Sequence, residues 1–360
     1  MPTVSICLPV YNGERFIAEA IESALSQTFT DFELLIADDC STDGSGGVLQ
    51  KYAMGDSRIV YWRNAANKGL FANYNESMSR ACGNLIKPFA QDDVWEPTIL
   101  ERMVQTFGES SGASLVTVAR TWIDEAGTAL PTNCQFSQNT RMDGNAVIAD
   151  CLLRLVNWIG EPSTVMFSRS HIGSGFDNSY YHLGDMEYWF RILRHGDYVF
   201  LNEALCKFRR HEQSTTNKNL KGLLFAVDMM RLGEQYSDIL QRCERTVRDF
   251  KINAMSHVSS FVGYSDGAGD IDIDGLLAQV PAGESEAREQ LQQFKELTYY
   301  ALLAAAQREE QHQARIATLE SEKFELESEL ARVLDSRYWK STALVRKAVR
   351  HLKSAKGPLR

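Results

Sequence analysis

The stretch from Asn84 to Pro97, NLIKPFAQDDVWEP, decides how the rest of this sequence is interpreted. Its apolar run over residues 85–90 predicts a buried strand that leads directly into two adjacent carboxylates, Asp92 and Asp93. In an open α/β sheet, ligands bind where the strands end, so this acid pair is a candidate cradle for a divalent cation that would hold phosphates. The alternative is that the pair caps a helix beginning near Glu96, because aspartate is a good N-cap.

Upstream of this stretch, strands and helices alternate. The spacing of apolar residues predicts strands at residues 4–10, 32–37 and 58–63, and helices at about residues 14–27, 45–54 and 70–81. Strands separated by helices form a largely parallel sheet that is covered on both faces. No Gly-x-Gly-x-x-Gly follows the first strand, and the sequence contains no Gly-x-x-x-x-Gly-Lys-Ser/Thr. A dinucleotide-dependent dehydrogenase and a P-loop enzyme are therefore poor fits.

Two more polar loops are expected at the same edge of the sheet as the acid pair. The second strand ends in Asp39, which suits a hydrogen bond to a base edge or a ribose hydroxyl. The loop Asn67-Lys68-Gly69 offers a cation beside a conformationally permissive glycine. Together, the three loops describe a site for a nucleoside diphosphate that is held through a metal ion.

Composition and charge narrow the class of protein. The chain has 360 residues, 44% of them hydrophobic, and a net charge of −9, which argues against nucleic-acid binding. No apolar run approaches the roughly 20 residues needed to cross a bilayer, and the N-terminus lacks a basic-then-apolar leader. Seven cysteines without a Cys-x-x-Cys pair favour reduced thiols in a cytoplasm.

Five motifs in order give a specific resemblance. The chain resembles glycosyltransferase family 2, the large inverting family with the GT-A fold, over roughly residues 2–216. The motifs are Pro9-Val10-Tyr11-Asn12-Gly13, Leu25-Ser26-Gln27-Thr28, Asp38-Asp39-Cys40-Ser41-Thr42-Asp43, Asn67-Lys68-Gly69-Leu70 with Asn75, and Gln91-Asp92-Asp93-Val94-Trp95. The resemblance implies a nucleotide-sugar donor, with Asp39 at the base or ribose and Pro9 and Tyr11 lining the base pocket.

The resemblance also implies a divalent cation, Mn²⁺ or Mg²⁺. The acid pair would serve the ribose, the metal and the diphosphate. Many family members have an aspartate where Ala90 stands, so only the second half of an Asp-x-Asp pattern is present. We favour Asp93 as the metal ligand, with Asp92 directed toward the ribose or sharing the ion.

A second informative stretch runs from His182 to Arg194 and predicts a loop that enters an amphipathic helix. Asp185 stands where a helix N-cap belongs, and capping alone would explain it. The resemblance instead implies that Asp185 is the catalytic base, because the family carries its base in an acid-containing loop before a helix. Glu187 is the alternative base, although its offset favours an ion pair with Arg191.

The segment Arg209-Arg210-His211 resembles the family's Arg-x-His stretch. Cationic side chains here would stabilise the charge that develops on a departing diphosphate, so Arg209 and His211 are expected to contact the donor. The alternative is a solvated basic turn at the end of a strand.

The C-terminal third predicts helices. We expect a catalytic domain at 1–216, with a nucleotide-sugar half (1–97) and an acceptor half (98–216), followed by a helical extension at 217–283. A long helix at 284–335 has a short heptad seam, flawed by a lysine, at Ile316, Leu319, Lys323, Leu326, Leu330 and Val333. This seam predicts either a homodimer through 309–337 or a helix that folds back against the body.

The tail at 336–360 carries eight Lys or Arg and no acidic residue. Its pattern of basic and apolar residues is typical of a helix lying on an anionic membrane surface, here through residues 337–360. A disordered charged end is the alternative.

The sequence therefore predicts a mainly parallel α/β protein of GT-A type with a C-terminal helical extension. The predicted function is metal-assisted inverting transfer from a nucleotide sugar, most simply a UDP-sugar, to a glycan or lipid-linked acceptor at the cytoplasmic membrane face. Two alternatives stay open. A nucleotidyltransferase would use similar carboxylates but needs a Gly- and Arg-rich first loop, and a non-catalytic scaffold would act through the coil and the tail.

Overall fold

The computed structural model describes residues 1–132, 134–180, 182–211, 224–262, 314–315, 317–325 and 327–328. The chain divides into two units, Met1–Thr298 and Tyr299–Arg360. In the second unit, the described residues are helical, and Leu319 and Phe324 are exposed to solvent. The tail at 336–360 lies outside the described residues, as does the part of the predicted helical extension at 263–283. The same is true of four positions of the predicted heptad seam, Ile316, Leu326, Leu330 and Val333.

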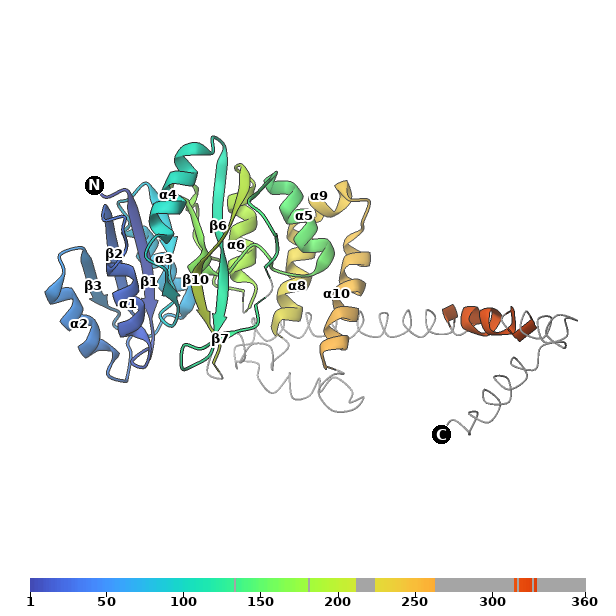
Figure 1. Cartoon of the computed structure of the whole chain (residues 1–360), viewed down its shortest axis with the longest axis horizontal. Coiled ribbons are helices and arrows are strands. Elements are labelled where there is room, and N and C mark those ends of the chain that lie inside the picture. Colours follow the sequence, from blue (N-terminus) through green and yellow to red (C-terminus); the bar gives the residue numbers. More distant parts are fainter. Residues whose placement is uncertain are drawn as a thin grey trace, which may run out of the picture. The chain divides into compact units, whose positions relative to one another are not determined.

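The first unit is built on one mixed sheet of ten strands (Figure 1). Its order is β3-β2-β1-β4-β9-β6-β10-β5, with β7 paired to β6 and β8 paired to β10. The strand bounds are β1 Val4–Val10, β2 Phe32–Asp38, β3 Ile59–Arg63, β4 Leu85–Pro88, β5 Val94–Trp95, β6 Ala113–Ile123, β7 Ala129–Leu130, β8 Thr140–Met142, β9 Val165–Ser168 and β10 Asp197–Arg209.

The sheet has a parallel half and a mixed half. Strands β1 to β4 pair in parallel, and β1 is buried along its whole length, as expected for a strand covered on both faces. Strand β9 then runs antiparallel to both β4 and β6, and so joins the N-terminal strands to the parallel pair of β6 and β10. The mainly parallel α/β fold that the sequence predicts is confirmed.

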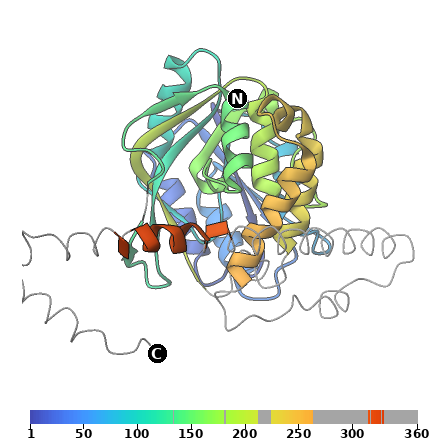
Figure 2. The same cartoon turned by 90° about the vertical axis from the view of Figure 1, so that its right-hand side faces the viewer.

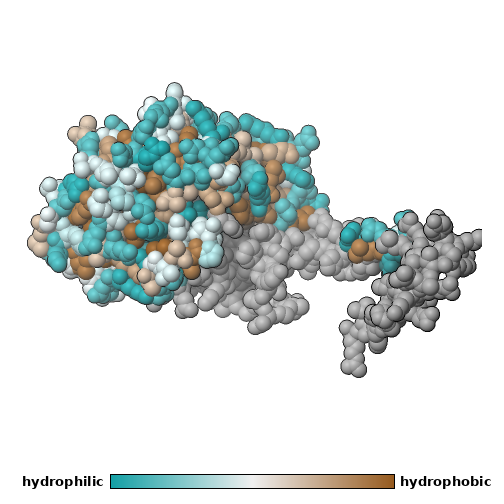
Figure 3. Space-filling model, in the orientation of Figure 1, coloured by the Kyte–Doolittle hydropathy of each residue, from teal (hydrophilic) through white to brown (hydrophobic). Residues whose placement is uncertain are grey.

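Helices lie on both faces of the sheet (Figures 1 and 2). In chain order they are α1 Ile17–Leu25, α2 Ser45–Gly55, α3 Leu70–Ser79, α4 Ile99–Glu109, α5 Gly144–Arg154, α6 Gly184–Leu193, α8 Leu224–Gln235, α9 Ser237–Arg242 and α10 Val247–Val262, with 3₁₀ turns η1 Pro162–Thr164 and η2 Arg169–His171. Helices α8 and α10 pack on each other, and α8 also contacts α6 (Figure 2). On the face drawn in Figure 3, apolar residues are scattered among polar ones.

Two predicted details of the acid-pair region are corrected by the structure. The strand ends at Pro88 rather than Ala90, and the acid pair does not cap a helix. Helix α4 begins at Ile99 with Thr98 as its N-cap, and the short strand β5 separates it from the aspartates. The residues directly after the acid pair form β5, which pairs with β10, and α4 begins only after this strand.

No helix in the described part of the chain is long and apolar enough to span a membrane.

Candidate functional site

The acid pair occupies the loop between β4 and β5, and its two carboxylates have different surroundings. Asp93 is buried; its Oδ1 accepts a hydrogen bond from the Arg209 backbone N–H at 2.9 Å, whereas its Oδ2 is buried without a hydrogen-bond partner among the described residues. Burial, and next the charge of Asp92, raise the pKa of Asp93 well above its usual range. An orphaned carboxylate oxygen in this position is poised to accept a proton or a cation.

Asp92 is partly exposed and forms a pair with a histidine. Its Oδ2 lies 2.8 Å from His211 Nε2. The predicted residues Asp92 and His211 are thus in contact, although 119 positions separate them in the chain. The structure makes this contact because β5 and β10 are antiparallel neighbours.

Arg209 anchors the acid pair instead of lying open to solvent. Its Nε donates to the Asp92 backbone carbonyl at 2.8 Å, and its Nη2 pairs with Glu19 at 2.5 Å. The guanidinium also lies over the Phe16 ring, 4.6 Å from its centroid. With a side chain only 2% exposed, Arg209 has its donors directed at protein groups.

These residues suit part of a divalent-cation site. A carboxylate and an imidazole in contact, beside the orphaned Asp93 oxygen, match the oxygen and nitrogen donors that Mn²⁺ accepts. Within the described residues, no three His, Cys, Asp or Glu side chains are grouped to hold a metal alone. Hard cations in phosphate-transfer sites are commonly held by one or two protein groups, with substrate phosphates completing the shell. The donor set therefore fits a cation that is shared with a diphosphate.

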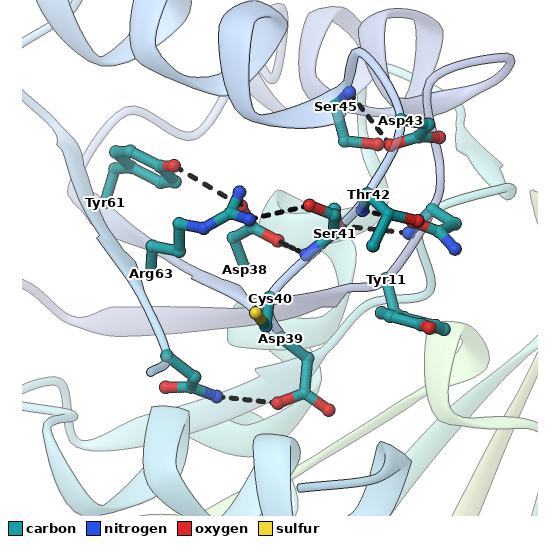
Figure 4. Close-up of polar contacts among 12 residues, drawn as sticks. Tyr11, Asp38, Asp39, Cys40, Ser41, Thr42, Asp43, Ser45, Tyr61 and Arg63 are labelled. Carbon is teal, nitrogen blue, oxygen red and sulfur yellow. Dashed lines mark hydrogen bonds and ion pairs between the residues drawn. The ribbon is translucent and has the colours of Figure 1, made fainter. Parts of the chain in front are cut away.

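The Asp39 carboxylate organises the neighbouring loop. Its oxygens accept hydrogen bonds from the Lys68 N–H at 2.9 Å, the Gly69 N–H at 2.9 Å and the Asn64 side chain at 2.8 Å (Figure 4 draws the last). Gly69 has φ +88°, a conformation that favours glycine, and it is the N-cap of α3. Asn67 Oδ1 also accepts from the Gly69 N–H, so the three predicted donor-loop residues and Asp39 form one unit.

Asp38, beside Asp39, has a structural role. Figure 4 shows its carboxylate between Arg63 and the Ser41 N–H, at 2.9 and 2.8 Å. The predicted base-pocket residues differ in exposure: Pro9 is buried within β1, whereas Tyr11 is 45% exposed. The backbone of Tyr11 exchanges two hydrogen bonds with the Gln91 side chain, at 2.9 and 3.1 Å, which joins the first loop to the acid-pair loop.

Asp185 is the second residue of α6, not its N-cap, so the capping explanation is wrong. Leu183 holds the N-cap position without a side-chain hydrogen bond. The Asp185 carboxylate accepts from the Met186 N–H at 2.7 Å and from Asn157 Nδ2 at 3.2 Å. Burial raises the pKa of Asp185 to about 7, and Glu161 and Asp228 act in the same direction. A carboxylate with this pKa is suited to accepting a proton near neutral pH.

Glu187 is a structural residue. It is 1% exposed, pairs with Arg191 at 2.8 Å as the spacing predicts, and accepts from Gln235 Nε2 at 2.8 Å. With those partners it joins α6 to α8 and is not available as a base.

Tyr74 relates the acid pair to Asp185. Burial raises the pKa of its phenol well above the usual range, and the charges of Asp93, Asp92 and Asp185 raise it further. The three carboxylates are therefore all within electrostatic reach of one hydroxyl group. Its oxygen donates to the Phe89 carbonyl at 3.2 Å, just upstream of the acid pair.

Sequence reasoning missed a buried lysine beneath the acid pair. Lys87 has no exposed surface, and its Nζ donates to the Ser163 carbonyl at 2.6 Å. Burial lowers the pKa of Lys87 to about 7, and Cys206 and Asp93 oppose that shift. A lysine inside an apolar strand run was the available signal. The loop residues Asn157, Glu161 and Ser163 were also missed, because no sequence pattern marks them.

The chain is similar to known glycosyltransferases. Residues 5–146 match the family model described as Glycosyl transferase family 2. These residues form a family 2 glycosyltransferase domain. The match includes Asp39, Asp92 and Asp93 and stops before Asp185 and His211. TuaG of Bacillus subtilis, named for teichuronic acid biosynthesis, is 28% identical over 224 residues, which are 61% of this chain and 84% of that protein.

Solved structures share the fold of this chain. TarS of S. aureus in complex with UDP-GlcNAc superposes with a TM-score of 0.56 at 15% identity, covering 82% of this chain and 81% of the other. The mannosyltransferase PcManGT from Pyrobaculum calidifontis, in complex with GDP-Man and Mn²⁺, gives 0.53 at 14% identity, covering 84% and 87%. These likenesses identify the GT-A type of fold.

Proposed function

We propose that the enzyme is an inverting glycosyltransferase that moves a sugar from a nucleotide-diphosphate donor, most simply a UDP-sugar, to a hydroxyl group of a saccharide acceptor. The observation that carries the proposal is the loop at residues 157–164, which bonds the Asp185 carboxylate through Asn157 and the Ala90 N–H, just before the acid pair, through Ser163. Burial also raises the pKa of Asp185 to about 7. That combination supplies a base on one side and a diphosphate anchor on the other.

In the proposed step, Asp185 accepts the proton of the acceptor hydroxyl while the hydroxyl oxygen attacks the anomeric carbon of the donor sugar. The bond between that carbon and the diphosphate oxygen breaks, and the nucleoside diphosphate leaves with the bonding electrons. Attack from the side opposite the leaving group inverts the anomeric configuration. Asn157 keeps the base oriented through its 3.2 Å hydrogen bond.

Asp92, His211 and Asp93 are the residues that would hold a divalent cation. Such an ion supplies positive charge to the diphosphate as it departs. We assign the more direct contact with the cation to Asp92 and His211, because Asp92 is partly exposed, whereas Asp93 accepts a hydrogen bond from the Arg209 backbone N–H. Arg209 supports the site by fixing the acid-pair loop, rather than by contacting the donor.

For the donor, the proposal assigns the nucleoside end to Tyr11, Pro9 and the Asp39 unit. Exposed Tyr11 offers an aromatic face for a base, and Asp39 holds the loop at Lys68 and Gly69 whose backbone borders this end of the sheet. UDP is favoured because TarS, which shares the fold, was crystallised with UDP-GlcNAc. For the acceptor, likeness to TuaG favours a glycan or lipid-linked saccharide of the cell surface. We further propose that the enzyme works at the cytoplasmic face of the membrane, where the basic tail at 337–360 would bind the anionic surface.

The test is a thermal-shift screen of nucleotide sugars with and without Mn²⁺, followed by product analysis of the best donor. Stabilisation that needs both sugar nucleotide and Mn²⁺, and release of a nucleoside diphosphate on turnover, are the expected results. Release of pyrophosphate from a nucleoside triphosphate and a sugar phosphate would favour a nucleotidyltransferase. If no sugar nucleotide shifts the melting temperature, the scaffold hypothesis replaces ours.

A further inference from the structure

The loop at residues 157–164 connects the two halves of the proposed reaction centre. At one end, Asn157 bonds the Asp185 carboxylate, and the Gly160 carbonyl accepts from Trp189 Nε1, one turn further along α6. At the other end, Ser163 Oγ accepts from the Ala90 N–H at 3.0 Å, immediately before the acid pair. Residues 161 and 162 therefore belong to a loop that contacts the Asp185 carboxylate at one end and the chain just before the acid pair at the other.

Glu161 lies in this loop and carries a negative charge. Its Oε2 lies 3.0 Å from Arg120 Nε on β6, and the two side chains are 25% and 22% exposed. Both atoms are buried and, within the described residues, neither makes a hydrogen bond of good geometry. The pair is therefore an ion pair whose directional hydrogen-bonding capacity is unused. The partly exposed remainder of each side chain is open to a ligand.

The charge of Glu161 contributes to the raised pKa of Asp185. Asp228 on α8 acts on Asp185 in the same direction.

We propose that Glu161 and Arg120 bind hydroxyl groups of the acceptor saccharide and hold its nucleophilic hydroxyl beside Asp185. This inference rests on the proposed function and adds acceptor-contact residues to it. A carboxylate accepts hydrogen bonds from sugar hydroxyls, while a guanidinium donates to their oxygens, so the pair matches neighbouring hydroxyls in both directions. Glu161 touches the acceptor and leaves the proton transfer to Asp185.

The test compares the wild type with Glu161→Gln, an isosteric change that removes the charge. The donors are a pool of UDP-GlcNAc, UDP-Glc, UDP-Gal, GDP-Man and dTDP-rhamnose with Mn²⁺, and the acceptors are a pool of p-nitrophenyl glycosides. Nucleoside diphosphate release is measured with and without acceptors across pH. Glu203→Gln is the matched control, because Glu203 pairs with Arg102 at 2.6 Å away from the site.

We expect Glu161→Gln to hydrolyse donors within about two-fold of the wild-type rate above the pKa of the base, and to lose roughly ten-fold or more of the stimulation by acceptors. The acid limb of its pH–rate profile should also move to lower pH, because removing a neighbouring negative charge lowers the pKa of Asp185. Glu203→Gln should match the wild type in both respects. A merely structural Glu161 would lower the melting temperature and leave the stimulation by acceptors at the wild-type level.

Equal stimulation of the wild type and Glu161→Gln by acceptors would overturn the inference. If no acceptor in the pool stimulates the wild type, the inference is overturned as well. If the wild type releases no nucleoside diphosphate from any donor, the proposed function itself fails, which is a different result.

Discussion

The Asp228 carboxylate on α8 accepts a hydrogen bond from the Leu183 backbone N–H at 2.8 Å. The same oxygen accepts from the His182 N–H at 2.6 Å, and Asp228 has no exposed surface. A residue of the helical extension thus holds the segment that leads into Asp185. The extension is therefore physically part of the proposed reaction centre, although it lies outside residues 5–146.

Replacing Asp228 with alanine should lower kcat by about ten-fold or more while leaving the donor KM within roughly two-fold, because two charge-assisted hydrogen bonds to the base segment are lost. Asp228→Asn keeps one acceptor oxygen and should recover part of kcat. Steady-state kinetics measure the split, and hydrogen exchange at His182 and Leu183 reports the released amides. A wild-type kcat in the alanine variant would contradict the positioning role.

Replacing Asp185 with asparagine should reduce transfer by about a thousand-fold or more, with donor affinity within a few-fold, because the base is lost and the donor contacts stay. Glu187→Gln is the matched comparison on the same helix. It should lower stability through its Arg191 and Gln235 contacts and leave substantial turnover. Initial rates and donor titrations on both proteins separate the two roles. Full activity of Asp185→Asn would remove the mechanism.

The pH dependence follows from the pKa of Asp185, which is raised to about 7. Turnover should rise as pH increases through about 7, because the base must be ionised. For stability the sign is opposite: the folded pKa of Asp185 lies above its unfolded value, so the free energy of unfolding falls as pH rises from about 4 to about 7. Asp185→Asn should therefore gain stability over the wild type across that window, by an amount on the order of a few kcal/mol. Denaturation at pH 5 and pH 8 measures this, and an unchanged difference would contradict it.

Replacing Asp39 with asparagine should weaken donor binding by roughly ten-fold, because one oxygen that accepts the Lys68 or Gly69 N–H becomes a donor facing another donor. Calorimetric titration with the sugar nucleotide found by screening measures the loss. Asp31→Asn, an exposed substitution at the far side of the β1–β2 pair, is the control and should bind normally. Equal affinities of the two variants would argue against the Asp39 unit as part of the donor site.

Gly184 has a steric reason to lack a side chain. A Cβ there would lie 2.5 Å from the Phe71 ring, which stacks on Phe176. Gly184→Ala should lower the free energy of unfolding by roughly 1–3 kcal/mol. Phe71→Leu in the same chain should recover part of the loss, as a double-mutant cycle by chemical denaturation would report. Additive losses would place the cause elsewhere.

Local patterns alone determined much of this protein. The apolar runs of β1, β2 and β4, and the helical spacing after them, predict the parallel half of the sheet because a buried strand and an amphipathic helix each leave a periodic mark. The polar residues at the strand ends then follow from topology, since parallel strands end at one edge. In this way Asp39, Asp92 and Asp93 could be chosen as candidates before any coordinates were known.

The tertiary structure decided the partners of those residues. In the structure, Arg209 contacts Asp92 and Glu19, and His211 pairs with Asp92. Glu187 connects α6 to α8, and Glu161 forms an ion pair with Arg120. None of these contacts produces a periodic pattern in the sequence. Each joins segments that are far apart in the chain and are brought together by strand pairing or helix packing. The proton affinity of Asp185 has the same origin, since burial and the charges of distant residues set it.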